Sequence, residues 1–359
     1  MKFGLFYQLP CADTQSEPVR YQETIEQIQH AETLGFDCAW MAELHFYKAF
    51  SIMSSPLILA TAIAQRTKSI RLGIAVNLLP LHHPIRSAED GATVDILTNG
   101  RLEFGVGRGA IPLHFAGFDV SRDDSRERFE ESLDVIKKAW GPTAFSHEGT
   151  YYHIPETNVV PKPLQKPHPP IRVAANSPDT AVFAGKSHYP VFVASVTNPL
   201  PRMFEQVATY RAAWQQAPAG VSGAPEPNVS TMFFFHPGES LEQVRQDIEP
   251  SLKNYFRSVS GMVQAGVKSE GSQASDESYR YLNEVQKMVD TITFDKINES
   301  MAIFGSSQEC IDKAKMLHKE LGMKELICWF NPGGLVPHEK VQKAMSRFAA
   351  EIMPELRAL

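Results

Sequence analysis

The chain contains few cysteines, and they show none of the spacings that build a cysteine-based site. Cys11, Cys38, Cys310 and Cys328 form no CxxC pair, which argues against a zinc site and against a disulfide framework. We expect free thiols in a reducing cytoplasm. The chain also lacks any apolar run near the roughly 20 residues that span a bilayer. Its N-terminal stretch alternates like a strand and is too polar for a signal peptide.

A surplus of positive charge is missing as well. The chain has 35 basic and 41 acidic residues and a formal net charge of −6, so it has no overall electrostatic attraction to nucleic acid. No solenoid-length repeat and no low-complexity tract occurs. What the chain does have is a 43% hydrophobic fraction over 359 residues, which supports a large core. This length fits a single α/β barrel domain covering residues 1–359.

Predicted strands and helices alternate along the chain. The segment 36–42 is nearly all apolar, as is typical of a parallel strand that is buried on both faces. Helical periodicity follows strands throughout, for example in 21–34, where Ile25, Ile28 and Ala31 share one face. Eight such units predict a (β/α)₈ TIM barrel. The expected strands are 2–7, 36–42, 70–79, 102–106, 171–175, 190–195, 229–236 and 325–330.

Two segments interrupt this alternation. Residues 141–170 are rich in proline but contain apolar and aromatic residues, with a hairpin expected around Tyr151 and Tyr152. We interpret this segment as an ordered excursion from the barrel. The stretch 258–278 is polar and rich in glycine and serine, and long polar loops in compact domains are often lids. The composition therefore predicts a lid or a disordered segment, and the family resemblance given below implies a mobile lid loop at about 258–285.

Two strand exits carry residue types that bind phosphate. Asn176-Ser177-Pro178-Asp179-Thr180 follows a predicted strand and begins a helix, so that free backbone N–H groups and hydroxyls would face an anion there. The same pattern also suits simple helix capping. Arg108 lies between two glycines after another strand, where its planar guanidinium could hold a phosphate. A salt bridge at the barrel rim is the alternative for Arg108.

A third strand exit carries acid/base residue types. His45 could donate or accept protons, with Glu43 orienting its ring. The alternative is a packed, hydrogen-bonded histidine without a catalytic role. The neighbouring pair His82-His83 has no evident third ligand, so a structural role is expected for it and no metal site is predicted. Because active sites of α/β barrels form at the strand exits, the three features together indicate a phosphate-bearing cofactor beside an acid/base histidine.

These residues belong to longer stretches that resemble the bacterial-luciferase-like flavin monooxygenases over nearly the whole chain. The stretches are MKFGLF, LGFDCAWMAELHF, LLPLHHPIRSAED, LTNGRLEFGVGRG, HEGTYYHIPETNVVPKPLQKPHPPI, GSSQECIDK and IMPEL. The resemblance implies a TIM barrel that binds reduced FMN (FMNH₂) delivered by a separate flavin reductase. Reaction with O₂ would give a flavin C4a-hydroperoxide, which then oxygenates a small organic substrate. It further implies a homodimer formed through the helix after His83.

The resemblance also assigns roles to individual positions. Arg108, Asn176, Ser177 and Thr180 would contact the flavin phosphate, and Ser195 would contact the flavin. Ala75-Val76 corresponds to a non-prolyl cis peptide under the isoalloxazine ring. Glu43 would line the flavin slot, and His45 is the candidate acid/base residue.

Two positions depart from the luciferase pattern. The catalytic histidine of the light-emitting subunit corresponds to Leu44, and its reactive cysteine corresponds to Gly107. Leucine cannot transfer protons, so luciferase-type aldehyde chemistry is not expected. A deazaflavin (F420) dehydrogenase shares the barrel and is one alternative. A non-catalytic flavin-binding subunit similar to the luciferase β subunit is another, but that subunit lacks the glycine-arginine-glycine that contains Arg108. We therefore favour an enzyme.

Overall fold

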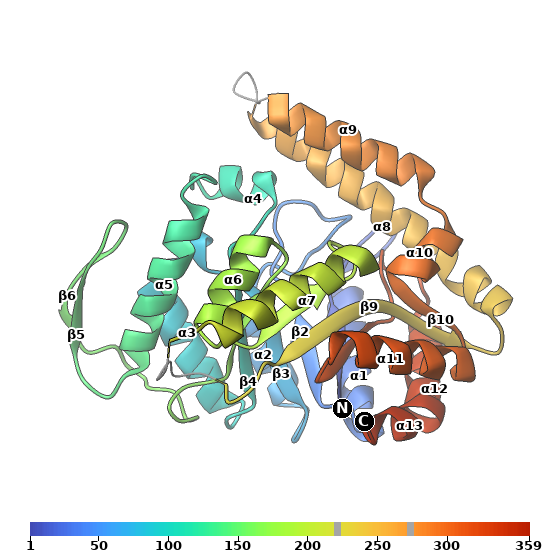
Figure 1. Cartoon of the computed structure of the whole chain (residues 1–359), viewed down its shortest axis with the longest axis horizontal. Coiled ribbons are helices and arrows are strands. Elements are labelled where there is room, and N and C mark those ends of the chain that lie inside the picture. The colour runs from blue at the N-terminus through green and yellow to red at the C-terminus, as the bar shows by residue number, and fades with distance from the viewer. Residues whose placement is uncertain (219–223, 271–275) are drawn as a thin grey trace.

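Eight parallel strands close into a barrel in the computed structural model, which describes residues 1–218, 224–270 and 276–359 (Figure 1). β11 pairs with both β9 and β1, and β8 pairs with β9, so the ring has no free edge. The predicted (β/α)₈ TIM barrel is confirmed. Its strands are β1 (Lys2–Tyr7), β2 (Cys38–Met41), β3 (Arg71–Leu78), β4 (Leu102–Gly107), β7 (Ile171–Ala174), β8 (Val191–Ala194), β9 (Val229–Gly238) and β11 (Glu325–Trp329).

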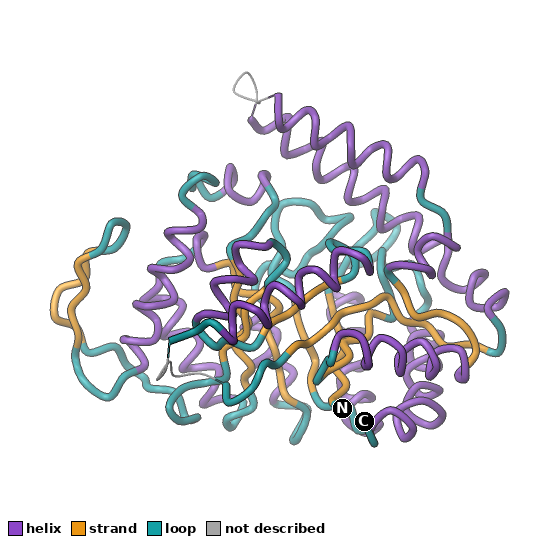
Figure 2. The backbone as a smooth tube through the Cα atoms, in the orientation of Figure 1, coloured by secondary structure: helices purple, strands orange, loops and turns teal. Residues whose placement is uncertain are grey.

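Helices surround the strands on all sides of the barrel wall (Figure 2). The first of them is α1 (Glu17–Leu34), which buries Ile25, Ile28 and Ala31 as its periodicity predicted and ends at Gly35 with φ of 84°. The others around the barrel are α2 (Pro56–Ala64), α3 (Pro84–Leu97), α5 (Ser125–Trp140), α6 (Pro178–Lys186), α7 (Leu200–Gln215), α11 (Ser307–Leu321), α12 (His338–Arg347), a π-helical turn Phe348–Ile352 and α13 (Met353–Arg357). Within the described residues, none of the helices is both long enough and apolar enough to cross a membrane.

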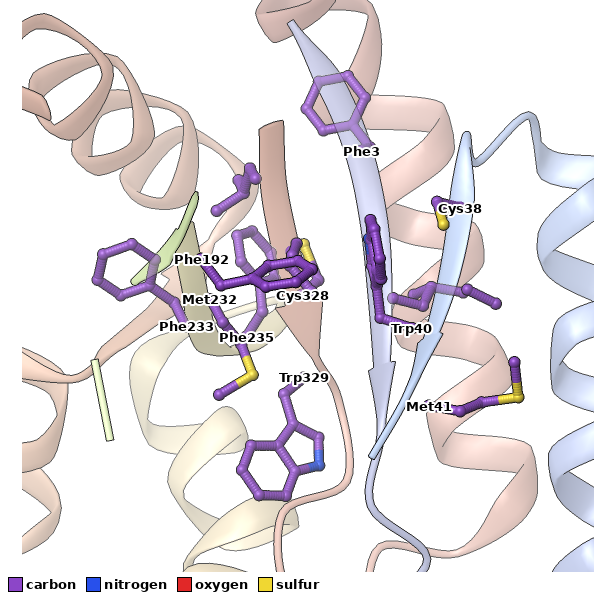
Figure 3. Close-up of a cluster of buried hydrophobic side chains, with 14 of the residues drawn as sticks. Phe3, Cys38, Trp40, Met41, Phe192, Met232, Phe233, Phe235, Cys328 and Trp329 are labelled. Carbon is purple, nitrogen blue, oxygen red and sulfur yellow. The ribbon is translucent and has the colours of Figure 1, made fainter. Parts of the chain in front are cut away.

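The lower part of the barrel interior is filled by side chains. Trp40 of β2 meets Phe192 of β8 edge to face, with 4.7 Å between ring centroids (Figure 3), and its Nε1 donates to Glu325 Oε1 at 2.8 Å. A Cβ atom at Gly73 would lie 2.0 Å from the Trp40 ring, so β3 has a glycine where this ring comes closest. The barrel interior is therefore packed around Trp40, and active sites of this fold lie at the carboxyl ends of the strands.

The four cysteines are buried and free, with no disulfide among them. Burial raises the pKa of each thiol, so the reactive thiolate form is disfavoured at neutral pH.

The proline-rich excursion contains the expected hairpin. β5 (Phe145–Glu148) and β6 (His153–Thr157) pair antiparallel and project from the barrel (Figure 1). Glu131 of α5 anchors the turn, because its carboxylate accepts hydrogen bonds from the backbone N–H groups of Thr150, Tyr151 and Tyr152.

The prediction of a lid loop at about 258–285 is wrong for the described residues of that range. α8 (Leu241–Glu270) continues to residue 270 and α9 (Asp276–Thr291) runs back, so the segment is a helical hairpin; residues 271–275 lie outside the described residues. Its glycines and serines conceal a helical pattern in which Val259, Met262 and Val263 face the protein interior. Figure 1 shows this hairpin above the barrel, on the side opposite the two chain termini.

The region after the hairpin also contains elements that the sequence did not predict. α10 (Phe294–Ser300) leads into β10 (Ala302–Ser306), which pairs in parallel with the second half of β9. β10 therefore extends the sheet outside the closed ring of eight strands.

Candidate functional site

Arg108 lies one residue beyond β4, beside the exit of β7. Val106 of β4 pairs with Val173 of β7, which brings Arg108 to the same end of the barrel as Asn176. The side chain of Arg108 is half-buried, and within the described residues it forms no hydrogen bond or ion pair. The alternative of a rim salt bridge therefore has no partner in the described parts of the chain. A half-buried guanidinium without a counter-ion favours an anionic ligand.

The N-terminus of α6 is capped as its sequence predicted. The Oγ atom of Ser177 accepts from the Thr180 backbone N–H at 3.4 Å and lies 2.9 Å from the Thr180 hydroxyl oxygen. Asn176 precedes this cap, and its Oδ1 accepts from the backbone N–H of Ala194 at 3.3 Å. Capping and anion binding are compatible here, because the cap occupies only one of the free N–H groups of the first turn.

β3 and β4 approach each other closely near their carboxyl ends, where β4 carries Gly105 and Gly107. The peptide bond between Ala75 and Val76 is cis, as the resemblance implied, and the pairing of β3 with β4 shifts register between Ile74 and Asn77. A Cβ atom at Gly107 would lie 2.4 Å from Val76 Cγ2. Glycine at position 107 thus leaves room for the Val76 side chain.

Glu43 is the centre of a buried polar cluster at the exit of β2. Its Oε1 accepts from His45 Nε2 at 3.0 Å and from His82 Nε2 at 2.5 Å, and its Oε2 accepts from the Leu78 backbone N–H at 2.9 Å. The Glu43 side chain is only 1% exposed. Glu43 and His82 also line a cavity of about 300 Å³ between α2 and α3. The sequence predicted a structural role for His82, but it did not reveal this contact with Glu43.

The charges in this cluster follow from its hydrogen bonds. Burial alone would raise the pKa of Glu43, but the bonds from His45, His82 and Leu78 outweigh burial and lower the pKa to about 2. Burial works against protonation of His82 as well, but the bond to Glu43 and its negative charge raise the pKa of His82 above its usual value. At neutral pH Glu43 is therefore a carboxylate, and its negative charge favours the protonated form of His82.

His114 joins the cluster from α4 (Pro112–Gly117), the short helix after Arg108. Its Nε2 accepts from the backbone N–H of His45 at 3.1 Å. Burial and the nearby His45 lower the pKa of His114 to about 4, so the ring is neutral at physiological pH. No sequence spacing signals this contact, because His114 is distant from His45 in the chain and lies in a segment without a strand.

The remaining predicted residues have clear local roles. His83 diverges from His82: it caps α3 through Nδ1, which accepts from the Ile85 backbone N–H at 3.3 Å. Ser195 is fully buried, and its hydroxyl donates to the Met301 carbonyl at 2.6 Å. The side chain of Ser195 therefore joins the exit of β8 to the start of β10.

The predicted residues thus form two groups at one end of the barrel. The first group consists of Arg108, the N-terminus of α6 and the cis Ala75-Val76 segment, at the exits of β3, β4 and β7. Glu43 and His45 belong to the second, at the exit of β2. The first group fits a phosphate-bearing cofactor, because it combines an arginine that has no partner among the described residues with the free N–H groups of a helix N-terminus.

Comparison with known proteins agrees with this fold. The profile of the luciferase-like monooxygenase family matches residues 1–325, and the chain belongs to this family. Its fold and its relatives identify it as a flavin-dependent monooxygenase.

Two curated relatives match almost the full chain. The oxygenase component of the flavin-dependent trigonelline monooxygenase of Acinetobacter baylyi is 27% identical over 99% of this chain and 95% of its own length. The alkanal monooxygenase alpha chain of the Kryptophanaron alfredi symbiont is 25% identical over 99% of both chains.

Solved structures share the fold. The monooxygenase RslO1 of Streptomyces bottropensis superimposes with a TM-score of 0.81 at 23% identity, covering 99% of this chain and 100% of that chain. The oxygenating constituent of 3,6-diketocamphane monooxygenase of Pseudomonas putida, solved with FMN, gives a TM-score of 0.77 at 18% identity over 99% and 98% of the two chains.

Proposed function

We propose that this chain is the oxygenase component of a two-component monooxygenase, which uses FMNH₂ and O₂ to oxygenate a small organic substrate. The observation that carries the proposal is Arg108, a half-buried guanidinium without a partner among the described residues, beside a capped helix N-terminus. A flavin phosphate would supply the missing negative charge. The name of the trigonelline relative, an oxygenase component, supports a separate flavin reductase as the source of FMNH₂.

Each residue of the first group has a proposed role toward the cofactor. Arg108 would hold the phosphate through its planar fork, and Ser177 and Thr180 would donate their hydroxyls to it. Asn176 would fix the start of α6, since its side chain binds the exit of β8. The cis Ala75-Val76 segment would support the flat ring, and Ser195 would shape the slot from β8.

His45 and Glu43 are the proposed acid/base pair, with Glu43 also forming part of the slot wall at the exit of β2. Glu43 holds the Nε2 atom of His45 as a hydrogen-bond donor, which fixes the ring orientation. When bound, reduced FMN supplies the electrons that activate O₂. The protein has to bind and orient the flavin and exclude water around it.

Titration and turnover together test this function. The purified chain should bind FMNH₂ more tightly than reduced F420 when both are titrated anaerobically side by side. With a flavin reductase and O₂ present, it should convert a substrate, sought first among N-heteroaromatic acids, aldehydes and ketones, to a product with one added oxygen atom. Preference for F420 would overturn the proposal in favour of a deazaflavin dehydrogenase. Tight flavin binding with no oxygenated product from any substrate would favour a non-catalytic subunit.

We also propose a homodimer through the face formed by α2 and α3. Ile58 of α2 is 72% exposed and Leu97 of α3 is 49% exposed, and a second chain packed on these two helices would cover both side chains. Light scattering after size exclusion should give twice the mass of one chain. Ile58→Glu should shift the species toward the monomer, whereas a native monomer would remove this part of the proposal.

A further inference from the structure

The short helix α4 connects three parts of the candidate site. It begins four residues after Arg108, so its position depends on the same segment that carries the proposed phosphate ligand. α4 also packs against α8. A Cβ atom at Gly266 of α8 would lie 3.4 Å from the backbone nitrogen of Leu113 in α4. Through His114 it also bonds to the exit of β2. A change at the exit of β4 can therefore be transmitted to β2 through α4.

The hydrogen bond between His114 and His45 has a defined donor and a defined acceptor. The Nε2 atom of His114 accepts a hydrogen bond from the backbone N–H of His45 at 3.1 Å, so that nitrogen carries no proton. The two rings meet edge to face, with 5.3 Å between their centroids. His114 is only 2% exposed, so water cannot readily replace the lost acceptor if the ring is removed.

Beyond His45 the hydrogen bonds continue to β3. His45 donates from Nε2 to Glu43, and Glu43 accepts from the backbone N–H of Leu78, two residues after Val76. The chain of bonds from His114 to Leu78 therefore spans the exits of β2, β3 and β4. It connects the proposed acid/base pair, the proposed ring support and the segment with the proposed phosphate ligand.

We propose that His114 is a positioning residue that sets the β2 exit, with Glu43 and His45, relative to the Arg108 segment. The functional part of this inference rests on the proposed flavin site. When a phosphate engages Arg108, the orientation of α4 is fixed, and His114 fixes the backbone of His45 in turn. The alternative is that His114 merely fills space in the core.

Conservative replacement separates these two possibilities. His114→Gln retains an acceptor oxygen close to the place of Nε2, whereas His114→Ala removes both the acceptor and the ring. His236 offers a matched control: it is 3% exposed, burial lowers its pKa to about 4 as for His114, and it lies near Asp247 and Lys340. His236→Ala should therefore create a comparable cavity without affecting the exit of β2.

The first measurement is hydrogen exchange of the full chain without flavin, resolved at the backbone amides of residues 44 and 45. His114→Ala should speed exchange of the His45 amide at least about fivefold, as expected for the loss of one buried hydrogen bond. The Leu44 amide bonds to the Met53 carbonyl and serves as an internal reference. His114→Gln should restore protection and His236→Ala should not change it. Unchanged protection in His114→Ala, or no restoration by Gln, overturns the proposal whether or not the chain binds flavin.

The second measurement concerns the flavin site and uses the same four proteins. His114→Ala should raise the FMN dissociation constant about fivefold and shift the pH profile of turnover, while His114→Gln stays within about twofold of wild type. Equal losses in His114→Ala and His236→Ala would show a general effect of core damage and contradict the positioning role. If the wild type binds no flavin, the proposed function fails, and the exchange result still decides the role of His114.

Discussion

Replacement of Arg108 by alanine should separate ligand binding from stability. Arg108 forms no hydrogen bond or ion pair with any described residue, so its removal breaks no polar interaction with the described parts of the fold. Substitutions of this kind change the free energy of unfolding by no more than about 0.5 kcal/mol. The same guanidinium would make two charge-assisted hydrogen bonds to a flavin phosphate, each contributing about 1.5 kcal/mol or more.

Arg108→Ala should therefore weaken FMN binding about 100-fold, since each 1.4 kcal/mol changes the dissociation constant about tenfold. The FMN affinity of Arg108→Lys should lie between those of the wild type and Arg108→Ala, because lysine keeps the charge but lacks the planar guanidinium. Anaerobic fluorescence titration gives the affinities, and urea denaturation without flavin gives the free energies of unfolding. Raising the salt concentration should weaken binding to the wild type more than binding to Arg108→Ala.

Arg101 provides the matched control at the opposite end of β4. Its guanidinium donates to Thr98, Thr67, Ile70 and Ala64, so Arg101→Ala should lower the free energy of unfolding by about 3 kcal/mol and leave the FMN affinity of the folded protein unchanged. Arg108 is not a phosphate ligand if Arg108→Ala proves as destabilising as Arg101→Ala while FMN affinity stays near wild type.

Three further predictions concern the site walls and the histidines. His45→Ala should lower turnover with FMN affinity near wild type in the steady-state and titration assays, and unchanged turnover would remove His45 from the mechanism. Gly107→Ala should cost about 1–3 kcal/mol in urea denaturation because its methyl group meets Val76; the added change Val76→Ala should recover most of this loss, and no recovery would show another cause. The free energy of unfolding should fall as pH drops from about 6.5 to about 4, by up to about 3 kcal/mol for each of His114 and His236, because their lowered pKa values mean that the unfolded chain binds more protons in this window. His236→Gln should flatten this pH dependence, and an unchanged slope would contradict the assignment.

The barrel could be predicted from sequence because each of its strands carries its own local signal. Apolar runs such as 36–42 and the helical periodicity of 21–34 depend on neighbouring residues alone, and the structure has β2 and α1 there. The prediction for 258–285 was wrong for the opposite reason. Glycines and serines dominate the local composition, whereas the helix is stabilised by residues such as Met262, which pack against distant parts of the chain.

The site was predictable where a single strand exit carries the chemistry. Arg108 and the Ser177 cap were identified from adjacent residues, and the structure brings them to neighbouring strand ends. The environment of Glu43 was not predictable, because His82 and His114 come from other segments and their contacts depend on tertiary geometry. Sequence spacing also does not reveal that the carboxylate of Glu43 borders a cavity between α2 and α3.

The burial of all four cysteines makes the native chain a convenient background for site-directed labelling. Their thiols are inaccessible and disfavour the thiolate, so maleimide reagents should leave the folded wild type unmodified. A single cysteine introduced at an exposed position, such as Glu148 in the hairpin of β5 and β6, would then be the one reactive thiol. Fluorophores placed this way could report on the arrangement of the loops around the barrel without removal of any native cysteine.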